Sequence, residues 1–536
     1  MLFKQTRIAS LALPILTLHL LFANSAVLAQ NETVPVEIET PNHINDLLQS
    51  IESEPDDAND DANDDAPQRS PREAWAYTTA KSIYVWAYPM SNLHNRRRVY
   101  LGANKLANAR KGRPRLLSRF IAPQKHQEKY DGIVPESPLH RIRMQTNYVQ
   151  AEQRFIVCPN QDVAYGLGFA DLSVSPVVFQ VPEFTDRYWS FQLSDQRSDV
   201  FATPGSRSKS PAGHYLIVGP DWSGETPDGI QRVITSPTRY IVMIPRVFMD
   251  DTTEDQRIVQ PLLNQVMSYP LAEFNGEMQT TDWSRQPKMR KTRRTSAINW
   301  VLPSRFWHRL PSVLEGLPPL AGEEVLYEQA AKLIAMAEED PRIAEVIVQA
   351  VTDAEREIVE PLKKFSNVGE SFGNGWYGSP LGGRFGTNYL DRTAVAVAYM
   401  LVNVPEDAFY LSADDDANGN QLDGTSKKYQ LTFPAGKLPP VDAFWSLTVY
   451  DEHHFFAENT IGRYSIGTKT KSLMPNADGS LTIYLQADPP AKDHFSNWLP
   501  IPADKFGMML RFYVPQQSVL DKSWQAPPIV VHTVEP

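Results

Sequence analysis

Short apolar segments separated by turn residues recur in two stretches of the chain. Between residues 154 and 249 they are spaced about ten residues apart, and the same rhythm resumes at Tyr429. Such spacing, with proline and glycine between the segments, is typical of antiparallel strands in a sandwich or barrel. The 43 prolines among 536 residues also favour turns and short strands over long helices. We therefore predict a mainly β fold with two antiparallel β-sandwich or jelly-roll-like domains.

Helical periodicity flanks and separates the two β stretches. Apolar positions recur every three to four residues over residues 71–89, and Pro71 suits a helix start. The same period predicts two helices between residues 321 and 365, and a third over residues 389–404. The predicted organisation is a signal peptide at 1–29, an acidic disordered linker at 30–70, a first β domain with an N-terminal helix at 71–258, a helical or irregular connector at 259–380, and a second β domain at 381–536.

The first 29 residues have the pattern of a secretory signal. Lys4 and Arg7 precede an apolar run at residues 8–23, and Val27-Leu28-Ala29 resembles a cleavage site. No later segment reaches the roughly 18 apolar residues of a membrane span. We therefore expect an exported protein, periplasmic or extracellular, with no membrane span after signal removal.

Charge and cysteine content bear on two questions, nucleic acid binding and disulfide formation. Most of the net charge of −11 belongs to the acidic linker, and the basic runs at 96–119 and 288–294 lack interleaved aromatic residues. We expect no nucleic acid partner, and homo-oligomerisation stays open. The chain has one cysteine, Cys158, so it has no intramolecular disulfide. The apolar segment 154–159 predicts a buried strand that holds a packed, structural thiol.

The segment 439–456 contains the best candidate for a central strand. Strand geometry would place Phe444, Ser446, Thr448 and Tyr450 on one face, and Trp445, Leu447, Val449 and Asp451 on the other. The strand ends in the reactive cluster Asp451, Glu452, His453 and His454, which could supply ligands to zinc, manganese or iron. Ordinary hydrogen-bonded residues at a strand end are the alternative.

A second candidate for metal binding is the loop at residues 414–424. Oxygen-bearing side chains alternate there as in the first half of a calcium loop, at Asp414, Asp416, Asn418 and Asn420. The closing bidentate glutamate is missing, so a polar turn without metal is the alternative. The cofactor is therefore undefined, with calcium or another divalent metal as the candidate.

Several multi-residue motifs resemble the paired families of unknown function DUF1254 and DUF1214, which follow one another in bacterial exported proteins. The first resemblance, over about residues 74–258, is carried by Pro159, Asn160, Asp162 and Tyr165, although Val163 replaces the threonine of the family pattern. The second, over about residues 381–515, is carried by residues 439–450, Asn459, Arg463, Tyr464, Arg511 and Tyr513. The resemblance implies two β-sandwich or jelly-roll-like domains with helical additions, and most members have no assigned activity.

The leading hypothesis is an enzyme that acts on a small or oligomeric extracellular compound at the interface of the two domains. Acid–base and related catalytic roles would fall to Asp162, Asp195, Asp451, Tyr165 and Tyr450. Substrate contacts would come from Asn160, Arg207, Asn459, Arg463, Tyr464 and Trp445, with Arg207 or Arg463 orienting an anionic or carbonyl group. The alternatives are a non-catalytic binding module with an aromatic platform, formed by Trp189, Trp222, Trp376 and Trp445, or a structural envelope protein.

Overall fold

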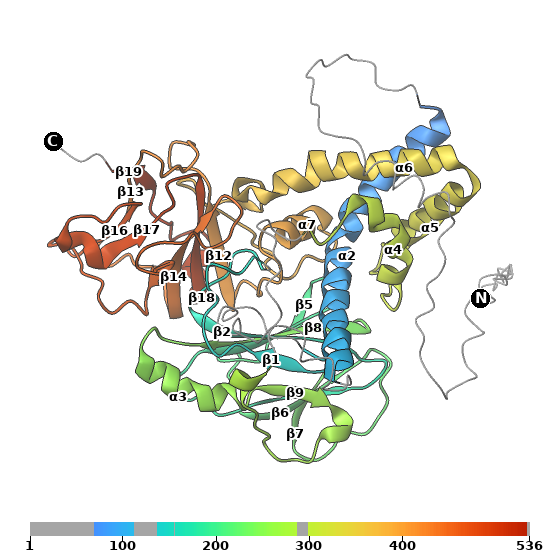
Figure 1. Ribbon diagram of the computed structural model, residues 1–536, viewed down its shortest axis with the longest axis horizontal. Helices are drawn as coiled ribbons and strands as arrows, with labels where there is room; N and C mark the ends of the chain where they lie inside the picture. The colour runs from blue at the N-terminus through green and yellow to red at the C-terminus, as the bar shows by residue number, and fades with distance from the viewer. Residues whose placement is uncertain (1–68, 112–136, 155, 287–298, 533–536) are drawn as a thin grey trace, which may run out of the picture. The chain divides into compact units, whose positions relative to one another are not determined.

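The computed structural model describes residues 69–111, 137–154, 156–286 and 299–532 (Figure 1). All of these residues belong to one compact unit of the chain. The predicted signal peptide, nearly all of the acidic linker and the basic run at 288–294 lie outside the described residues. No helix in the described part of the chain combines the length and the hydropathy that crossing a membrane requires.

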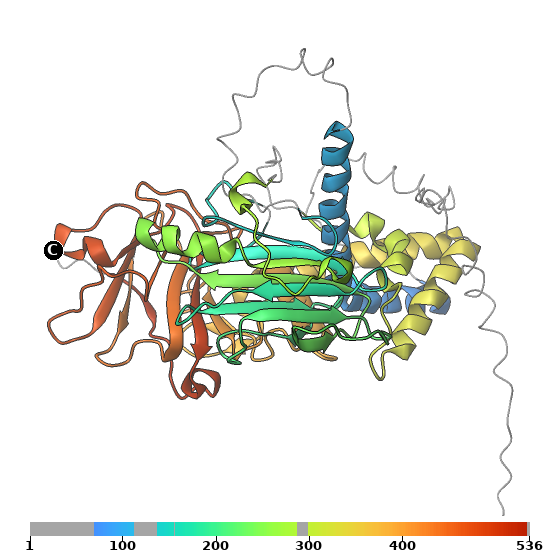
Figure 2. The same ribbon diagram turned by 90° about the horizontal axis from the view of Figure 1, so that it is seen from below.

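The first β region spans residues 142–270 and consists of two stacked sheets (Figure 2). The sheets have the strand orders β1-β2-β8-β4-β5 and β7-β6-β3-β9. Their strands are β1 (Ile142–Met144), β2 (Val163–Asp171), β3 (Val177–Val181), β4 (Trp189–Ser194), β5 (Val200–Ala202), β6 (Gly213–Val218), β7 (Ile230–Thr235), β8 (Tyr240–Phe248) and β9 (Met267–Pro270). Phe179 of β3 stacks on Phe191 of β4 with ring centroids 4.0 Å apart, which joins the two sheets through a shared core.

The second β region spans residues 370–531 and again has two sheets, with the orders β10-β11-β12-β18-β14-β15 and β17-β16-β13-β19. Its strands are β10 (Glu370–Ser371), β11 (Tyr377–Gly378), β12 (Ala408–Ala413), β13 (Tyr429–Phe433), β14 (Val441–Asp451), β15 (Ser465–Gly467), β16 (Leu481–Gln486), β17 (Trp498–Pro500), β18 (Phe506–Pro515) and β19 (Ile529–Val531). Phe433 of β13 packs against Trp445 of β14 at 5.2 Å between ring centroids, inside the core of this region.

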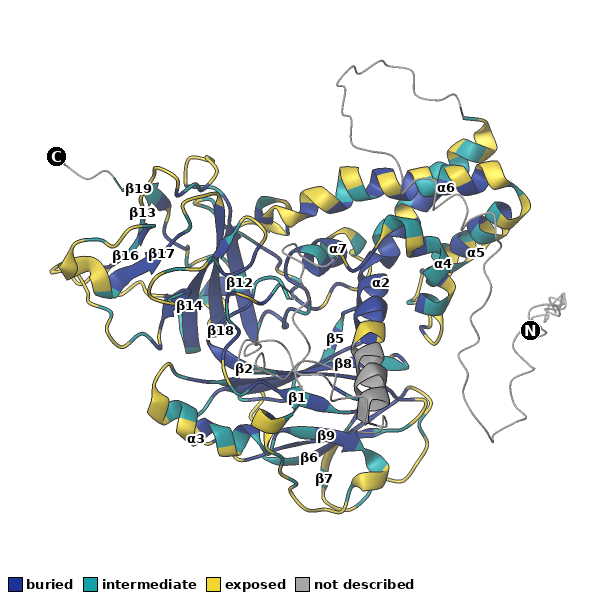
Figure 3. Cartoon of the chain, viewed as in Figure 1, coloured by how far each residue is buried: buried dark blue, intermediate teal, exposed yellow. Residues whose placement is uncertain are grey.

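Helices precede and connect the two β regions. They are α2 (Pro71–Lys111), α3 (Thr253–Leu263), α4 (Pro303–Leu314), α5 (Glu324–Glu339), α6 (Pro341–Ala354), α7 (Tyr389–Ala398) and the short α8 (Gln517–Leu520). Helix α2 begins with a capping box, because the Ser70 N–H donates to the Glu73 carboxylate at 2.7 Å and the Glu73 N–H donates to the Ser70 hydroxyl at 3.3 Å. Apolar faces of α2, α4, α5 and α6 share one core, while α6 alternates between buried and exposed residues (Figure 3).

The mainly β fold and the helical additions confirm the prediction from sequence, but four local expectations were wrong. Helix α2 does not end at Pro89 but continues to Lys111. The residues on either side of the proline, Tyr88 and Met90, are buried in the shared helical core, and this burial offsets the hydrogen bond that the proline lacks. Helix α7 ends at Ala398 rather than at residue 404, since Met400 and Leu401 take left-handed φ values of 48° and 56°. In the segment 154–159 the described residues are irregular rather than a strand, with φ of 49° at Cys158. Two strand pairs, β6–β7 and β16–β17, are parallel rather than antiparallel.

Strand β14 has the two faces that its alternating sequence predicts. Trp445, Leu447 and Val449 lie in the core of the second β region. On the opposite face, the Ser446 hydroxyl donates to the Asp162 carboxylate at 2.6 Å, and the Tyr450 hydroxyl donates to the Pro159 carbonyl at 2.7 Å. The polar face of β14 therefore contacts the segment that leads into β2 of the first β region.

Candidate ligand-binding site

A cavity of about 110 Å³ lies where the two β regions and the segment after α7 meet. We call it the junction cavity. Strands β2 and β8 contribute to its wall from the first region, and β12 and β18 contribute from the second. Arg96 of α2, residues 145, 149 and 156–159, and residues 399–402 complete it. The strands can serve both a core and a cavity because successive side chains point to opposite faces. In β18, for example, Met509 and Arg511 line the cavity, whereas Met508, Leu510 and Phe512 belong to the core.

Most of the cavity wall is apolar. Leu167, Phe169, Ile244 and Met400 belong to one cluster of buried apolar side chains that lines it. The polar side chains of the wall include three arginines, Arg96 of α2, Arg246 of β8 and Arg511 of β18, together with Tyr165, Tyr410 and Gln145. A cavity with this balance of apolar surface and few polar groups can hold a small organic molecule in a defined orientation.

Arg246 is only 4% exposed and is held by neutral acceptors. Its Nη1 donates to the Gln192 side-chain oxygen at 2.7 Å and to the Asn403 side-chain oxygen at 3.0 Å. Its Nη2 donates to the Leu401 carbonyl at 3.0 Å. The guanidinium carbon lies 5.5 Å from the centre of the Tyr165 ring. Arg246 thus fixes the backbone of the segment after α7 against the first β region.

Arg511 is 2% exposed and joins the second β region to the first. Its Nη1 donates to the Thr448 hydroxyl at 2.7 Å, and its Nη2 donates to the Cys158 carbonyl at 2.9 Å and to the Tyr450 hydroxyl. Burial disfavours its charged form, but the pKa of Arg511 is still held above its usual value by neighbouring groups, Tyr450 first among them. The side chain therefore stays cationic inside the protein.

Asn160 and Asp162 do not line the cavity, and Asn160 bonds to Tyr165, which does. The Asn160 amide donates to the Tyr165 hydroxyl at 2.6 Å and to the Tyr513 hydroxyl at 2.7 Å, while its oxygen accepts the Asp162 backbone N–H at 3.1 Å. The Asp162 carboxyl is 1% exposed and accepts one hydrogen bond, from Ser446. Its other oxygen has no partner among the described residues. Four of the residues singled out from sequence, Asn160, Asp162, Tyr165 and Tyr450, are thus brought together here.

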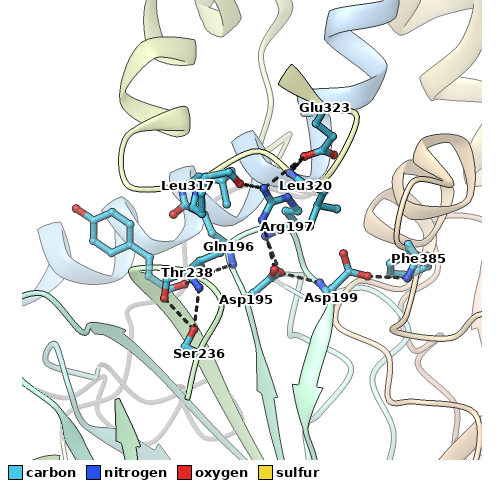
Figure 4. Close-up of polar contacts among 12 residues, drawn as sticks. Asp195, Gln196, Arg197, Asp199, Ser236, Thr238, Leu317, Leu320, Glu323 and Phe385 are labelled. Carbon is cyan, nitrogen blue, oxygen red and sulfur yellow. Dashed lines mark hydrogen bonds and ion pairs between the residues drawn. The ribbon is translucent and has the colours of Figure 1, made fainter. Parts of the chain in front are cut away.

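Asp195 lies in a different buried network, at the end of β4 (Figure 4). One carboxylate oxygen accepts the backbone N–H groups of Arg197 at 2.8 Å and Asp199 at 3.0 Å. The Arg197 guanidinium lies 3.7 Å from the other oxygen and also contacts Glu323 at 3.4 Å. Burial, reinforced by the charge of Asp199, raises the pKa of Asp195 to about 7. Asp195 lines a second, smaller cavity of about 20 Å³ and does not line the junction cavity.

The remaining residues proposed for substrate binding and catalysis occupy structural positions away from the junction cavity. Arg207 forms an ion pair with Asp407, and Asp451 forms one with Arg154. The Asn459 amide donates to the Arg463 carbonyl at 3.0 Å, and Arg463 donates to the Trp498 carbonyl at 2.7 Å. The Tyr464 ring stacks on Phe456 at 4.6 Å, and three tryptophans of the proposed aromatic platform lie in the two cores, namely Trp189, Trp376 and Trp445.

The proposed metal ligands form a hydrogen-bonded turn. One Asp416 oxygen accepts the backbone N–H groups of Asn418 at 2.8 Å and Asn420 at 3.0 Å. The Asp414 carboxylate accepts the Phe365 N–H. At the end of β14, the His454 ring stacks on Phe365 at 3.9 Å, and burial lowers its pKa to about 3. Within the described residues, no three His, Cys, Asp or Glu side chains are grouped so that they could hold a metal ion.

A pattern in the sequence points to Arg246 and Arg511, although the functional hypotheses drawn from the sequence gave neither a role. Arg246 interrupts the apolar run of β8, and Arg511 interrupts that of β18. Lysine and arginine are rarely buried without partners. A cation inside a strand that is otherwise apolar on both faces therefore indicates a polar site against one face of the sheet.

Comparison with known proteins identifies the two β regions. A search of the curated proteins found no match for the chain. Among solved structures, the crystal structure of the VPA0106 protein from Vibrio parahaemolyticus is similar, with 20% sequence identity, a TM-score of 0.54, and coverage of 85% of this chain and 100% of that chain. At this identity the likeness concerns the fold alone. A putative uncharacterized protein from Burkholderia cenocepacia matches with 14% identity and a TM-score of 0.37, over 85% of this chain and 98% of that one.

Two family models match the chain. The first, described as a protein of unknown function (DUF1254), matches residues 139–270, and the second, described as a protein of unknown function (DUF1214), matches residues 407–517. The matched segments coincide with most of the first and second β regions, and residues of both line the junction cavity. The chain is therefore a protein that carries a DUF1254 region followed by a DUF1214 region, in the order that its sequence motifs indicate.

Proposed function

We propose that this protein binds a small, largely apolar organic molecule in the junction cavity. The observation that carries the proposal is the cavity itself, which has an apolar wall with a few convergent polar groups and lies between the DUF1254 and DUF1214 regions. Its volume of about 110 Å³ is somewhat smaller than the roughly 150 Å³ of an apolar protein cavity that holds benzene. The ligand would be of comparable size.

The position of the family motifs supports the same proposal. Tyr165 from the DUF1254 region and Arg511 from the DUF1214 region both line the cavity, and Asn160 bonds to Tyr165. We also infer that the protein is exported and meets its ligand in the periplasm or outside the cell. The support for export is the signal-like pattern of the first 29 residues.

Chemical conversion of the bound molecule is a second candidate function, favoured by the state of Asp162. This buried carboxyl has one oxygen without a partner among the described residues, and it lies beside Asn160, which bonds to Tyr165 on the cavity wall. Asp162 would then act as an acid or base, with Tyr165 as the group that contacts the substrate. In this case Asp162→Asn should abolish product formation and leave ligand affinity nearly unchanged.

The proposal can be tested by filling the cavity. Wild-type protein is screened by thermal shift against small organic compounds, and we expect some to raise its melting temperature, because a ligand at 100 times its Kd adds about 2.7 kcal/mol of stability. Met400→Trp places a larger side chain on the cavity wall and should abolish this increase. Met278→Trp is the matched control, since Met278 is 40% exposed and does not line the cavity.

Two results would contradict binding in this cavity. The first is that no compound of suitable size stabilises the wild-type protein. The second is that Met400→Trp, in a folded protein, responds to ligand as strongly as Met278→Trp does.

A further inference from the structure

We propose that the ligand of the junction cavity is a short organic acid whose carboxylate lies between Arg246 and Arg511. This inference rests on the proposed binding function and names the chemical class of the ligand. It follows from three features of the wall: the charge balance, the positions of the remaining donors, and the apolar side chains beside them.

The charge balance of the site is positive. Arginine remains protonated even when buried, and a buried charge is costly unless it is paired. Arg246 and Arg511 are both almost fully buried, yet neither has a described carboxylate within 4.0 Å. Asp162 is the one carboxyl group among the neighbours that raise the pKa of Arg511, and Arg96 is a third arginine on the same wall. The wall therefore carries more positive than negative groups, and a ligand with a negative charge would offset part of this excess.

The two arginines also retain donors for such a ligand. A guanidinium has five N–H groups, and the contacts of Arg246 and Arg511 to protein acceptors involve their terminal Nη atoms. Among the described residues, the Nε of neither arginine has a hydrogen-bond partner, and both side chains line the cavity. Tyr410 lies near both cations, so its hydroxyl adds a neutral donor at the same end. Charge-assisted hydrogen bonds of this type suit a carboxylate.

The apolar side chains of the wall indicate the chemistry and size of the rest of the ligand. Leu167, Phe169, Ile244 and Met400 form an apolar surface that offers no hydrogen bonds to a polar chain. The cavity volume of about 110 Å³ is below that of a cavity that holds benzene, so it limits this part of the ligand to a short alkyl chain. Inorganic phosphate would satisfy the arginines but would leave the apolar surface without contacts. A short monocarboxylic acid such as butanoate or pentanoate matches both the arginines and the apolar side chains of the wall.

The test compares acids with neutral molecules of the same shape. Binding of butanoate and pentanoate to the full chain is measured by isothermal titration calorimetry at pH 7, beside butanamide, pentanamide and inorganic phosphate. Hydrogen bonds to charged groups contribute about 1.5–3 kcal/mol, so each acid should bind roughly 10- to 100-fold more tightly than its amide. Phosphate should bind more weakly than either acid.

Variants then assign the effect to the arginines. Arg246→Gln and Arg511→Gln should lower butanoate affinity by roughly 10-fold or more and lower butanamide affinity by clearly less. Arg257→Gln is the matched control, since Arg257 is an exposed arginine on α3 with an ion pair to Glu254. Tyr410→Phe removes a donor without removing a charge. It should give a smaller loss of butanoate affinity, and it provides the test if a glutamine variant does not fold.

The outcomes separate this inference from the proposed function. If the amides bind as tightly as the acids, the carboxylate assignment is wrong and small-molecule binding in the cavity stands. If phosphate binds more tightly than either acid, the site is for a different anion and the assignment is equally wrong. If neither acids nor amides bind, and Met400→Trp behaves like wild type with every compound, both the inference and the proposed function fail.

Discussion

At the scale of single residues, Asp195 is a carboxyl group whose surroundings oppose its charge. It is buried, and the neighbouring Asp199 carries the same charge. The nearest guanidinium nitrogen of Arg197 lies 3.7 Å from the carboxylate, beyond hydrogen-bond distance. Two backbone N–H groups still require an acceptor at this position. The side chain therefore serves the fold as a hydrogen-bond acceptor, and its negative charge is a cost that appears only when the proton leaves.

This cost should be visible as a pH dependence of stability. The pKa of Asp195 is raised from 3.8 to about 7 in the folded protein, so the folded state holds the proton more tightly than the unfolded chain. Its contribution to stability is complete below about pH 4 and is lost as the pH rises towards 7. Asp195→Asn keeps the acceptor and removes the titration. Its melting temperature should therefore improve relative to wild type between pH 5 and pH 8.

Differential scanning fluorimetry at several pH values measures this difference. Asp414 also has a raised pKa of about 7, so the wild-type curve contains both groups and only the difference between the two proteins reports on Asp195. Parallel curves for wild type and Asp195→Asn across this range would show that Asp195 does not titrate as described.

At the scale of elements, the two faces of strand β14 have different roles. One face packs into the core of the second β region, and the other makes polar contacts with the first region. This division could be predicted, because alternation along a strand is a local property of the sequence. The partners of the polar face could not be predicted, since Asp162 is 284 residues from Ser446 in the sequence.

Two substitutions on this strand should affect different properties, one mainly stability and the other mainly ligand affinity. Leu447→Ala removes a fully buried side chain from the core and should lower the free energy of unfolding by about 2–5 kcal/mol, with ligand affinity nearly unchanged. Tyr450→Phe removes the hydroxyl that contacts Arg511 and the Pro159 carbonyl. It should weaken ligand binding more than it lowers stability.

Urea denaturation and calorimetric titration of the same two variants provide the measurement. Equal loss of affinity in both would mean that the faces of β14 are not independent. Unchanged affinity in Tyr450→Phe would remove this tyrosine from the support of the cavity.

At the scale of the whole molecule, the β rhythm of the sequence predicts most strands, whereas the cavity depends on contacts that no local pattern contains. Residues 444–450 were predicted with their correct faces, whereas Asp451, predicted on the core face, pairs with Arg154. The segment around Cys158 was wrongly predicted as a strand because its apolar residues pack against neighbours in an irregular conformation. Asn160 and Tyr165 were found through family motifs. Arg246 was missed because a single charge in an apolar run does not reveal which groups surround it.

The same long-range contacts predict that the two β regions unfold together. Asn160 bonds to Tyr513, Asp162 to Ser446, and Arg511 to the Cys158 carbonyl, and all of these groups are buried or partly buried. Differential scanning calorimetry of the full chain should therefore give one transition for the two regions, and a bound ligand should move it as a whole. Two separate transitions, of which a cavity ligand moves only one, would contradict this coupling.

The contact between Asn160 and Tyr513 also sets an order of events during synthesis. The two residues are 353 positions apart, and a ribosome that adds about 5–20 residues each second needs roughly 18–70 s to cover that distance. Throughout this interval the strands that will form one wall of the cavity have no opposite wall. A newly made chain can therefore acquire its ligand only after its last long strand has emerged, and until then the amide that Asn160 will donate to Tyr513 bonds to water.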